Sequence, residues 1–417
     1  MSMLNIYSGS WVPRTIIHLE EFSSFLKFGA APFGVDKVKL GELRKLLSAS
    51  DVVIEKGKID RLTATMSGYQ FNYLDDGTML IATDTTLEEL APTFHNLTDF
   101  YLKKILIAYS CVYSKGSPIP KSFDSARAIT PSIITADKLT PEQISSIFDK
   151  LQDKIVSEYK RGSSAVYFGE YATVIVGESA DNIEVVRHFI FLRDFKDQLE
   201  RLLHAHRQIW DEITAIREKE TVHFLDLPNF RDSLLNLSKD ISFFKSRLAQ
   251  MDLYIKKRMN VMEDVLGKTS LKQYIEDELS SLFDAHEYFT DLWEMTDNYA
   301  NSTFELITFL YQENEQKEIN VLQVIFIIGV LASLLTLGAM PGANLTFRNA
   351  AGQIIGQGQL ESFNLVSFLQ FGSIAFITSV VVYYILHFSF TRLKKLRVVD
   401  KAIHRARSME SIFKYLK

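Results

Sequence analysis

The sequence is poor in the features on which enzyme chemistry depends. Its 417 residues include a single cysteine, Cys111, so no disulfide can form within one chain. The phosphate-binding pattern GxxxxGKS/T, the zinc-protease pattern HExxH, a CxxC pair and the nucleophile elbow GxSxG are all absent. One cysteine and nine histidines also offer few ligands for zinc. We therefore expect a protein that is not an enzyme and that holds no organic cofactor.

Glycine and proline are missing from a long stretch, Lys268 to Ile328. Because these residues are the usual helix breakers, the stretch predicts one unbroken helix. Apolar side chains recur along it at helical spacings: Leu271, Ile275, Leu279, Leu282, Phe289, Trp293, Leu306 and Leu310. A one-sided apolar stripe of this length cannot be buried alone, so we expect a homo-oligomer. Acidic residues crowd the same helix from Glu276 to Glu318, which predicts either a solvated helix face or, in several copies around an axis, a surface that concentrates cations.

Formal charge is missing from the run that follows, Val321 to Met340. About twenty residues of helix reach about 30 Å, which is the thickness of a bilayer's hydrocarbon core. A second charge-free run, Leu365 to Leu386, is followed by a basic cluster: Arg392, Lys394, Lys395 and Arg397. The two runs predict two transmembrane helices. The alternative for each run is a helix buried in a large protein core.

The distribution of lysine and arginine predicts how the chain is oriented in a lipid bilayer. Nine of these residues and two acidic ones follow Phe390, whereas the loop from Gly342 to Phe363 holds only Arg348 and Glu361. Positive flanks stay on the cytoplasmic side, so we expect both termini in the cytoplasm and residence in an inner or plasma membrane. The rest of the chain is acidic, and we expect no nucleic-acid partner.

The N-terminal part mixes short β-rich runs with helical stretches. Turn residues such as Asp75-Asp76-Gly77 separate the runs, and a helix is predicted from Thr140 to Tyr159, opened by an N-cap threonine and Pro141. This mixture predicts an α/β domain. The predicted strands are Arg61 to Met66, Gln70 to Leu74, Met79 to Thr83, Lys104 to Tyr113, Ala165 to Gly169 and Ala172 to Val176.

The predicted fold class is an α/β cytoplasmic domain followed by long helices and two C-terminal transmembrane helices. The domain boundaries are 1–180 for the α/β domain, 181–266 for a helical segment, 267–340 for a stalk helix that continues into the first membrane helix, 341–362 for the external loop, 363–390 for the second membrane helix and 391–417 for the basic tail.

Two motifs connect this layout with a known family. Gly342-Ala343-Asn344 follows the first apolar run, and HFSFTRLKKLR closes the second. Together with the layout they resemble the CorA family of magnesium transport proteins, which has a Gly-Met-Asn motif at the outer end of its first membrane helix. In this chain Ala343 stands in place of the family's methionine, and Pro341 in place of the aromatic residue before it.

The resemblance implies a homopentameric channel or transporter for Mg²⁺ or a related divalent cation, gated by its cytoplasmic domain. Gly342, Ala343 and Asn344 would form the selective pore mouth, where Asn344 would meet the metal through its hydration water. The alternative is a plain turn. One face of the first membrane helix would line the pore, and it consists of Leu322, Phe326, Gly329, Ser333, Thr336 and Met340. The alternative for Gly329, Ser333 and Thr336 is that these small residues serve helix packing.

Two further hypotheses stay open. Some CorA-like proteins serve as membrane effectors in antiviral signalling, in which a nucleotide second messenger binds the cytoplasmic part, and the altered motif is compatible with such a role. A zinc transporter on the same scaffold is a third hypothesis, which the small number of histidine and cysteine residues does not favour.

Overall fold

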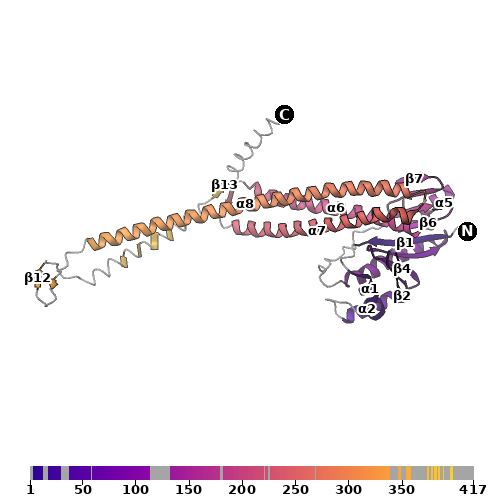
Figure 1. Cartoon of the computed structure of the whole chain (residues 1–417), viewed down its shortest axis with the longest axis horizontal. Coiled ribbons are helices and arrows are strands. Elements are labelled where there is room, and N and C mark those ends of the chain that lie inside the picture. The colour runs from indigo at the N-terminus through magenta and orange to yellow at the C-terminus, as the bar shows by residue number, and fades with distance from the viewer. Residues whose placement is uncertain are drawn as a thin grey trace, which may run out of the picture. The chain divides into compact units, whose positions relative to one another are not determined.

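A computed structural model provides the structure of the chain (Figure 1). It describes residues 3–12, 17–29, 37–57, 59–112, 132–178, 182–219, 221–223, 226–267, 269–338, 346–348, 354–357, 373–374, 377–378, 380–382, 384–385, 388 and 395–397.

The chain divides into two compact units. Unit 1 comprises Met1–Ala205 and Phe243–Trp293, and unit 2 comprises His206–Ser242 and Glu294–Lys417. Three long helices, α6 (Ile183–Arg217), α7 (Leu227–Leu266) and α8 (Lys272–Gly338), contribute residues to both units.

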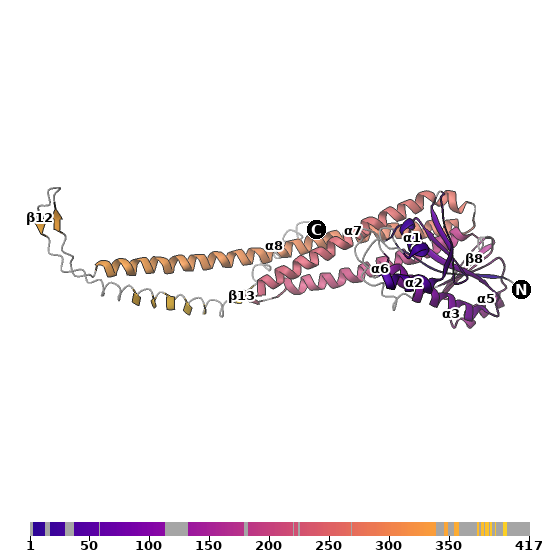
Figure 2. The same ribbon diagram turned by 90° about the horizontal axis from the view of Figure 1, so that it is seen from below.

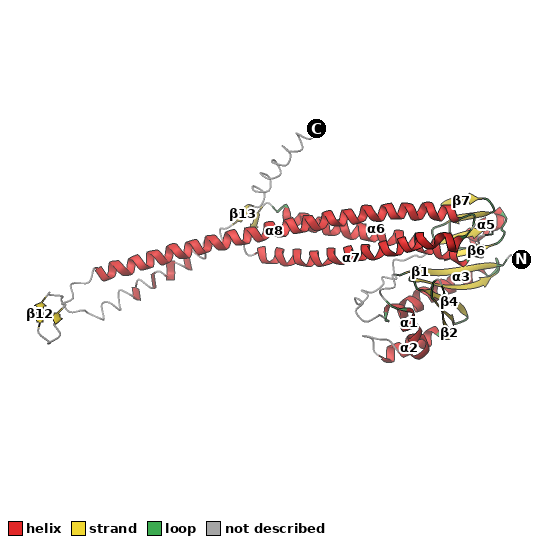
Figure 3. Ribbon diagram, in the orientation of Figure 1, coloured by secondary structure: helices red, strands yellow, loops and turns green. Residues whose placement is uncertain are grey.

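Unit 1 is built on a nine-stranded sheet with the order β2-β3-β4-β5-β1-β6-β9-β8-β7. Its strands are yellow in Figure 3. Neighbouring strands pair antiparallel except β6 and β9, which pair parallel. The strands are β1 (Leu4–Trp11), β2 (Ala49–Glu55), β3 (Arg61–Met66), β4 (Tyr69–Leu74), β5 (Thr78–Thr85), β6 (Ser132–Ala136), β7 (Ser157–Arg161), β8 (Ser164–Phe168) and β9 (Ala172–Val176).

Short helices of unit 1 pack on this sheet, where Figure 2 shows α1, α2 and α3 beside it. They are α1 (Leu19–Phe28), α2 (Lys37–Leu47), α3 (Leu90–Phe100), the π-helix η1 (Tyr101–Ile105), α4 (Leu106–Ser110) and α5 (Pro141–Lys150). The side chains of Phe22, Phe71 and Leu97 belong to one buried hydrophobic cluster that joins these helices to the strands.

The two faces of β1 are covered differently, because alternate side chains of a strand point to opposite sides. Leu4 and Ile6 lie in the cluster shared with the short helices. Trp11 points to the other face, where its ring contacts Phe191 of α6 at 4.9 Å and Tyr254 of α7 at 5.5 Å between ring centres. The sheet of unit 1 therefore lies between the short helices and the unit 1 parts of α6 and α7.

Unit 2 contains the remaining parts of the long helices and two small sheets. Trp210 of α6 stacks on Tyr299 of α8 with ring centres 4.5 Å apart, and Arg217 lies over the same tyrosine ring. The strands of unit 2 are β10 (Thr221–His223), which pairs with β13 (Lys395–Arg397), and β11 (Thr346–Arg348), which pairs with β12 (Ile354–Gln357).

Several predictions of secondary structure are confirmed. Five of the six predicted strands coincide with β3, β4, β5, β8 and β9 within one or two residues. The Asp75-Asp76-Gly77 turn joins β4 to β5, with Gly77 at a φ of 89° that glycine adopts without strain. The three long helices are present, and α8 alone has 67 residues, or about 100 Å at 1.5 Å per residue.

The predicted strand from Lys104 to Tyr113 is wrong, because this segment continues α3 through η1 into α4. Burial of Tyr101, Ile105 and Tyr109 at intervals of four residues outweighs the β propensity of their side chains. The predicted helix from Thr140 ends early, at Lys150, and β7 follows. Its start is confirmed, since Thr140 Oγ1 accepts a 3.3 Å hydrogen bond from the Gln143 amide.

The prediction of two C-terminal transmembrane helices is overturned. Among the described residues, no helix combines the length and the apolar character needed to cross a bilayer. Helix α8 is described as far as Gly338, and Lys317 and Glu318 precede its apolar part. The second predicted span, Leu365 to Leu386, lies largely outside the described residues.

The reason given for a homo-oligomer is also corrected. The side chains of Leu271, just before α8, and of Ile275 and Leu279 on α8 are fully buried in unit 1, and Leu310 is buried in unit 2. His286 shows how the chain itself covers this helix, because its Nε2 lies 2.8 Å from the Leu248 carbonyl oxygen of α7. The apolar stripe is therefore satisfied within one chain, and the homo-oligomer stays a prediction without that support.

Candidate functional site

The pore residues proposed from the sequence are only partly described. Leu322, Phe326, Gly329 and Ser333 lie on α8, where Phe326 is 72% exposed and Ser333 donates a 2.8 Å hydrogen bond to the Gly329 carbonyl. Thr336 also belongs to α8. The others lie outside the described residues: Met340, Gly342, Ala343 and Asn344. Ion transport through that mouth stays a prediction.

The basic cluster and the metal sites are also only partly described. Lys395 and Arg397 lie on β13, whereas Arg392 and Lys394 are outside the described residues. Over the part of the chain that the structure describes, no group of three or more His, Cys, Asp or Glu side chains could hold a metal ion. On the acidic stretch of α8, Glu313 instead pairs with Lys317 at 2.8 Å.

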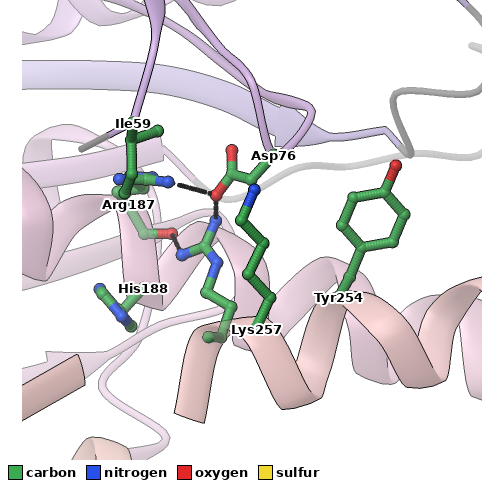
Figure 4. Close-up of a pocket in the computed structure, with 7 residues that line it drawn as sticks. Ile59, Asp76, Arg187, His188, Tyr254 and Lys257 are labelled. Atoms are coloured by element: carbon green, nitrogen blue, oxygen red, sulfur yellow. Dashed lines mark hydrogen bonds and ion pairs between the residues drawn. The ribbon is translucent and has the colours of Figure 1, made fainter. Parts of the chain in front are cut away.

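A different site lies in unit 1, at the turn between β4 and β5. There the side chain of Asp76 meets residues of α6 and α7, and the group lines a small pocket, drawn in Figure 4. The seven lining residues are Ile59, Asp76, Arg187, His188, Tyr254, Lys257 and Arg258. We call Asp76, Arg187 and Arg258 the arginine cluster.

Arg187 reaches Asp76 from the first turns of α6. Its Nη2 and Nε atoms lie 2.5 Å and 3.2 Å from the same carboxylate oxygen, Oδ2 of Asp76. Its Nη1 atom donates a 2.8 Å hydrogen bond to Glu184, one helical turn earlier. Arg187 therefore joins two acidic groups, Asp76 and Glu184, through different nitrogens of its guanidinium.

Arg258 approaches from α7 and bonds the same oxygen of Asp76 through its Nη2 atom. That atom also donates to Thr78 Oγ1 at 2.7 Å, and the guanidinium lies 4.4 Å from the centre of the Phe191 ring. The other oxygen of Asp76, Oδ1, accepts a 2.9 Å hydrogen bond from the Thr78 amide. A single carboxylate oxygen thus carries contacts from two arginines.

Burial makes this cluster electrostatically demanding. The side chains of Asp76, Arg187 and Arg258 are 6%, 3% and 3% exposed. Burial raises the pKa of Asp76, but the charges of Arg258 and Arg187 outweigh it and hold the pKa well below the usual value. Burial lowers the pKa of Arg258 to about 10, a shift that the charge of Asp76 opposes. All three groups are therefore charged at neutral pH.

His188 and Lys257 complete the polar lining. His188 Nδ1 lies 2.6 Å from the Glu184 carbonyl oxygen. Burial, aided by the charge of Arg258, lowers the pKa of His188 to about 3, so its ring is neutral. Lys257 is half exposed, lies 3.6 Å from the carboxylate of Asp75, and points toward the turn in Figure 4.

Two buried polar atoms of this pocket have no hydrogen-bond partner among the described residues. One is Nε of Arg258, which is a donor, and the other is Nε2 of His188. Because Nδ1 of the neutral imidazole donates to a carbonyl, its Nε2 must be an acceptor. Buried polar atoms without partners are uncommon in folded proteins, and they often mark a place where a water molecule, an ion or a ligand binds.

Sequence reasoning identified the Asp75-Asp76-Gly77 turn but missed the cluster. Arg187 and Arg258 lie 111 and 182 positions from Asp76, and no local spacing connects them. The only signal in the sequence is that Arg187 interrupts an apolar helical segment, between Val186 and Phe189, whereas Arg258 follows two lysines.

Comparison with known proteins adds no family. No protein-family model matches the chain, and no curated protein sequence matches it significantly.

Proposed function

We propose that this chain is a ligand-binding signalling protein, and that unit 1 recognises a small anionic ligand carrying a phosphate group at the arginine cluster. The observation that carries the proposal is the pair of buried guanidinium groups, one of which keeps an unused Nε–H donor. Arginine forms directed hydrogen bonds with phosphate oxygens and is the usual residue at such sites.

The charges around the pocket also support an anion. Lys257 lies at the pocket with a half-exposed side chain, where it would attract an approaching anion before the buried arginines meet it. Tyr254 supplies a hydroxyl-bearing ring to the same lining. Three cationic side chains and a neutral histidine line the pocket beside a single carboxylate, that of Asp76.

A signalling role is supported by the helices that carry the site. Arg187 and His188 belong to α6, and Arg258 belongs to α7, and both helices also contribute residues to unit 2. A ligand that changes the positions of these side chains would therefore act on helices shared by both units. The nucleotide messenger suggested by the CorA resemblance is one ligand with the required phosphate.

The proposal is tested by titrating the full chain with inorganic phosphate and with AMP at constant ionic strength, using calorimetry and thermal unfolding. We expect saturable binding and a rising unfolding midpoint with at least one of the two, and no saturation with chloride. AMP binding more tightly than phosphate would identify a nucleotide, and the reverse would identify the free ion.

Matched variants on α7 locate the site. Lys257→Glu reverses a charge at the pocket, and Lys256→Glu makes the same change one residue earlier, where the lysine pairs with Asp252. We expect only Lys257→Glu to weaken phosphate binding, by about tenfold, because a like charge at the pocket repels the anion. Equal effects of the two variants, or no saturable binding by the parent chain, would contradict the proposal.

A further inference from the structure

Asp76 occupies the position in the arginine cluster where an anionic ligand would bind. Its Oδ2 atom receives Arg187 through two nitrogens and Arg258 through one. These are the contacts that two arginines make with an oxygen of a bound phosphate or carboxylate. In the chain without ligand, the aspartate at the β4–β5 turn therefore acts as an internal substitute for an anion.

The pocket has no room for a second anion beside Asp76. Its volume is about 10 Å³, which is about the space that one water molecule requires. Charge leads to the same conclusion, since the buried arginines 187 and 258 are already balanced by the carboxylates of Asp76 and Glu184. Adding an anion would leave an excess of buried negative charge, which is strongly unfavourable.

The two unpartnered atoms indicate what a better occupant would offer. Nε of Arg258 needs an acceptor, and Nε2 of His188 needs a donor. Asp76 satisfies neither of them. A phosphate group has more oxygens than a carboxylate, and in its monoprotonated form one of them carries a hydrogen. It therefore offers both kinds of partner, an acceptor and a donor.

Resting on the function proposed above, we infer that a phosphate group binds unit 1 by replacing the Asp76 carboxylate on Arg187 and Arg258, so that ligand binding releases the β4–β5 turn. The ligand class is phosphate or a phosphate monoester that bears a P–OH group. Asp76 is then a competitor built into the fold.

Release of the Asp76 carboxylate from the arginines would loosen the β4–β5 turn. Besides the arginines, three contacts hold this turn. The amide of Thr78 donates to Asp76 Oδ1, Trp11 Nε1 donates a 2.8 Å hydrogen bond to the Asp76 carbonyl, and Lys257 pairs with Asp75. Loss of the carboxylate from the cluster removes the first contact directly. Hydrogen exchange of the Thr78 amide should therefore report the replacement.

The test compares Asp76→Asn, which removes the competing charge at nearly constant shape, with Asp84→Asn, which makes the same change at an exposed position of β5. Phosphate should bind Asp76→Asn at least about tenfold more tightly than the parent and should raise its unfolding midpoint more. The affinity of Asp84→Asn should match the parent. Deuterium uptake by the 75–78 peptide of the parent should increase when phosphate is added.

The outcomes separate the two proposals. If the parent binds phosphate but Asp76→Asn binds it equally or more weakly, the replacement is wrong and the anion-binding function stands. The same conclusion follows if phosphate leaves exchange in the 75–78 peptide unchanged or slows it, a measurement on the parent that does not depend on the variant folding. If neither the parent nor Asp76→Asn binds phosphate, both proposals fail.

Discussion

Asp76 and Arg258 are 182 positions apart in the sequence, yet their side chains form an ion pair that is almost fully buried in unit 1. The pair joins the β4–β5 turn to α7, and Arg187 joins the same turn to α6. Removing two charges from water is costly, and their attraction compensates only when the remaining hydrogen bonds are made. The arginine cluster therefore ties the position of the β4–β5 turn to the positions of α6 and α7.

Arg258→Met should destabilise unit 1 by about 3–5 kcal/mol, because it leaves the buried carboxylate of Asp76 with one arginine where it had two. Urea unfolding followed by circular dichroism measures the change. The control is Lys256→Met on the same helix, where the lysine forms an exposed pair with Asp252 and the loss should stay within about 1 kcal/mol. Similar losses for both variants would show that the cluster does not stabilise the fold.

His188 should make stability fall as the solution becomes acidic. Its pKa is about 3 in the folded chain and 6.5 at its ordinary value, so between these pH values the unfolded chain binds a proton that the folded chain does not. The free energy of unfolding should therefore decrease by about 2 kcal/mol between pH 7 and pH 5 from this group. Urea midpoints measured across this range test the expectation.

The matching variant is His188→Asn, whose amide can still donate to the Glu184 carbonyl but does not titrate. This variant should lose most of the pH dependence between pH 7 and pH 5, whatever its stability at pH 7. His204→Asn, at an exposed position of the same helix, should keep the parental slope. An unchanged slope in His188→Asn would assign the pH dependence to other groups.

Local patterns explain which parts of the fold were predictable. Alternating strands such as Arg61–Met66, the turn at Gly77 and the cap at Thr140 depend on neighbouring residues, and each was found. Helix α4 was missed because Ile107, Tyr109 and their neighbours favour strands when taken alone. Its helical form depends on packing of Tyr101 and Tyr109 against distant residues, such as the hydroxyl of Ser10, 2.5 Å from that of Tyr101.

The candidate site was not predictable from sequence, because its parts come together only in the folded unit. Asp76 looked like an ordinary turn residue, and its carboxylate becomes unusual only through Arg187 and Arg258. In the opposite direction, the apolar run after Val321 was taken as a membrane span from its composition.

Self-association of the chain stays a prediction, and the structure changes where to test it. The stripe up to Leu310 is buried, whereas Phe326 and Ile327 of α8 are exposed by 72% and 56%. Exposed apolar clusters of this kind are typical of surfaces that bind another protein chain. Serine at both positions should lower the mass measured by light scattering from that of an assembly, expected to be a pentamer, toward that of one chain.

Met295→Ser is the control for that experiment, because Met295 is an exposed apolar residue of α8 that lies far along the helix from Phe326 and Ile327. It should leave the measured mass unchanged. A parent chain with the mass of a single copy would show the homo-oligomer prediction to be wrong. An assembly that survives serine at both positions would place the interface elsewhere.

Gly9 of β1 offers a test of the packing between β1 and β5, with Gly41 of α2 as the comparison. A Cβ atom on Gly9 would lie 2.5 Å from the Met79 carbonyl oxygen and 2.8 Å from Leu80 Cβ, closer than carbon atoms tolerate. Gly9→Ala must therefore move the backbone of paired strands, and we expect a loss of about 1–3 kcal/mol.

Gly41→Ala should act in the opposite direction. Gly41 lies inside α2, and a Cβ atom there would meet nothing within 4 Å. Alanine is the better helix former and restricts the unfolded chain, so a gain of about 0.5–1 kcal/mol is expected. Urea unfolding of both variants gives the comparison. A neutral Gly9→Ala would show that the strand pairing at Gly9 is looser than the register of β1 with β5 indicates, and a loss in Gly41→Ala would contradict the expected gain in helix stability.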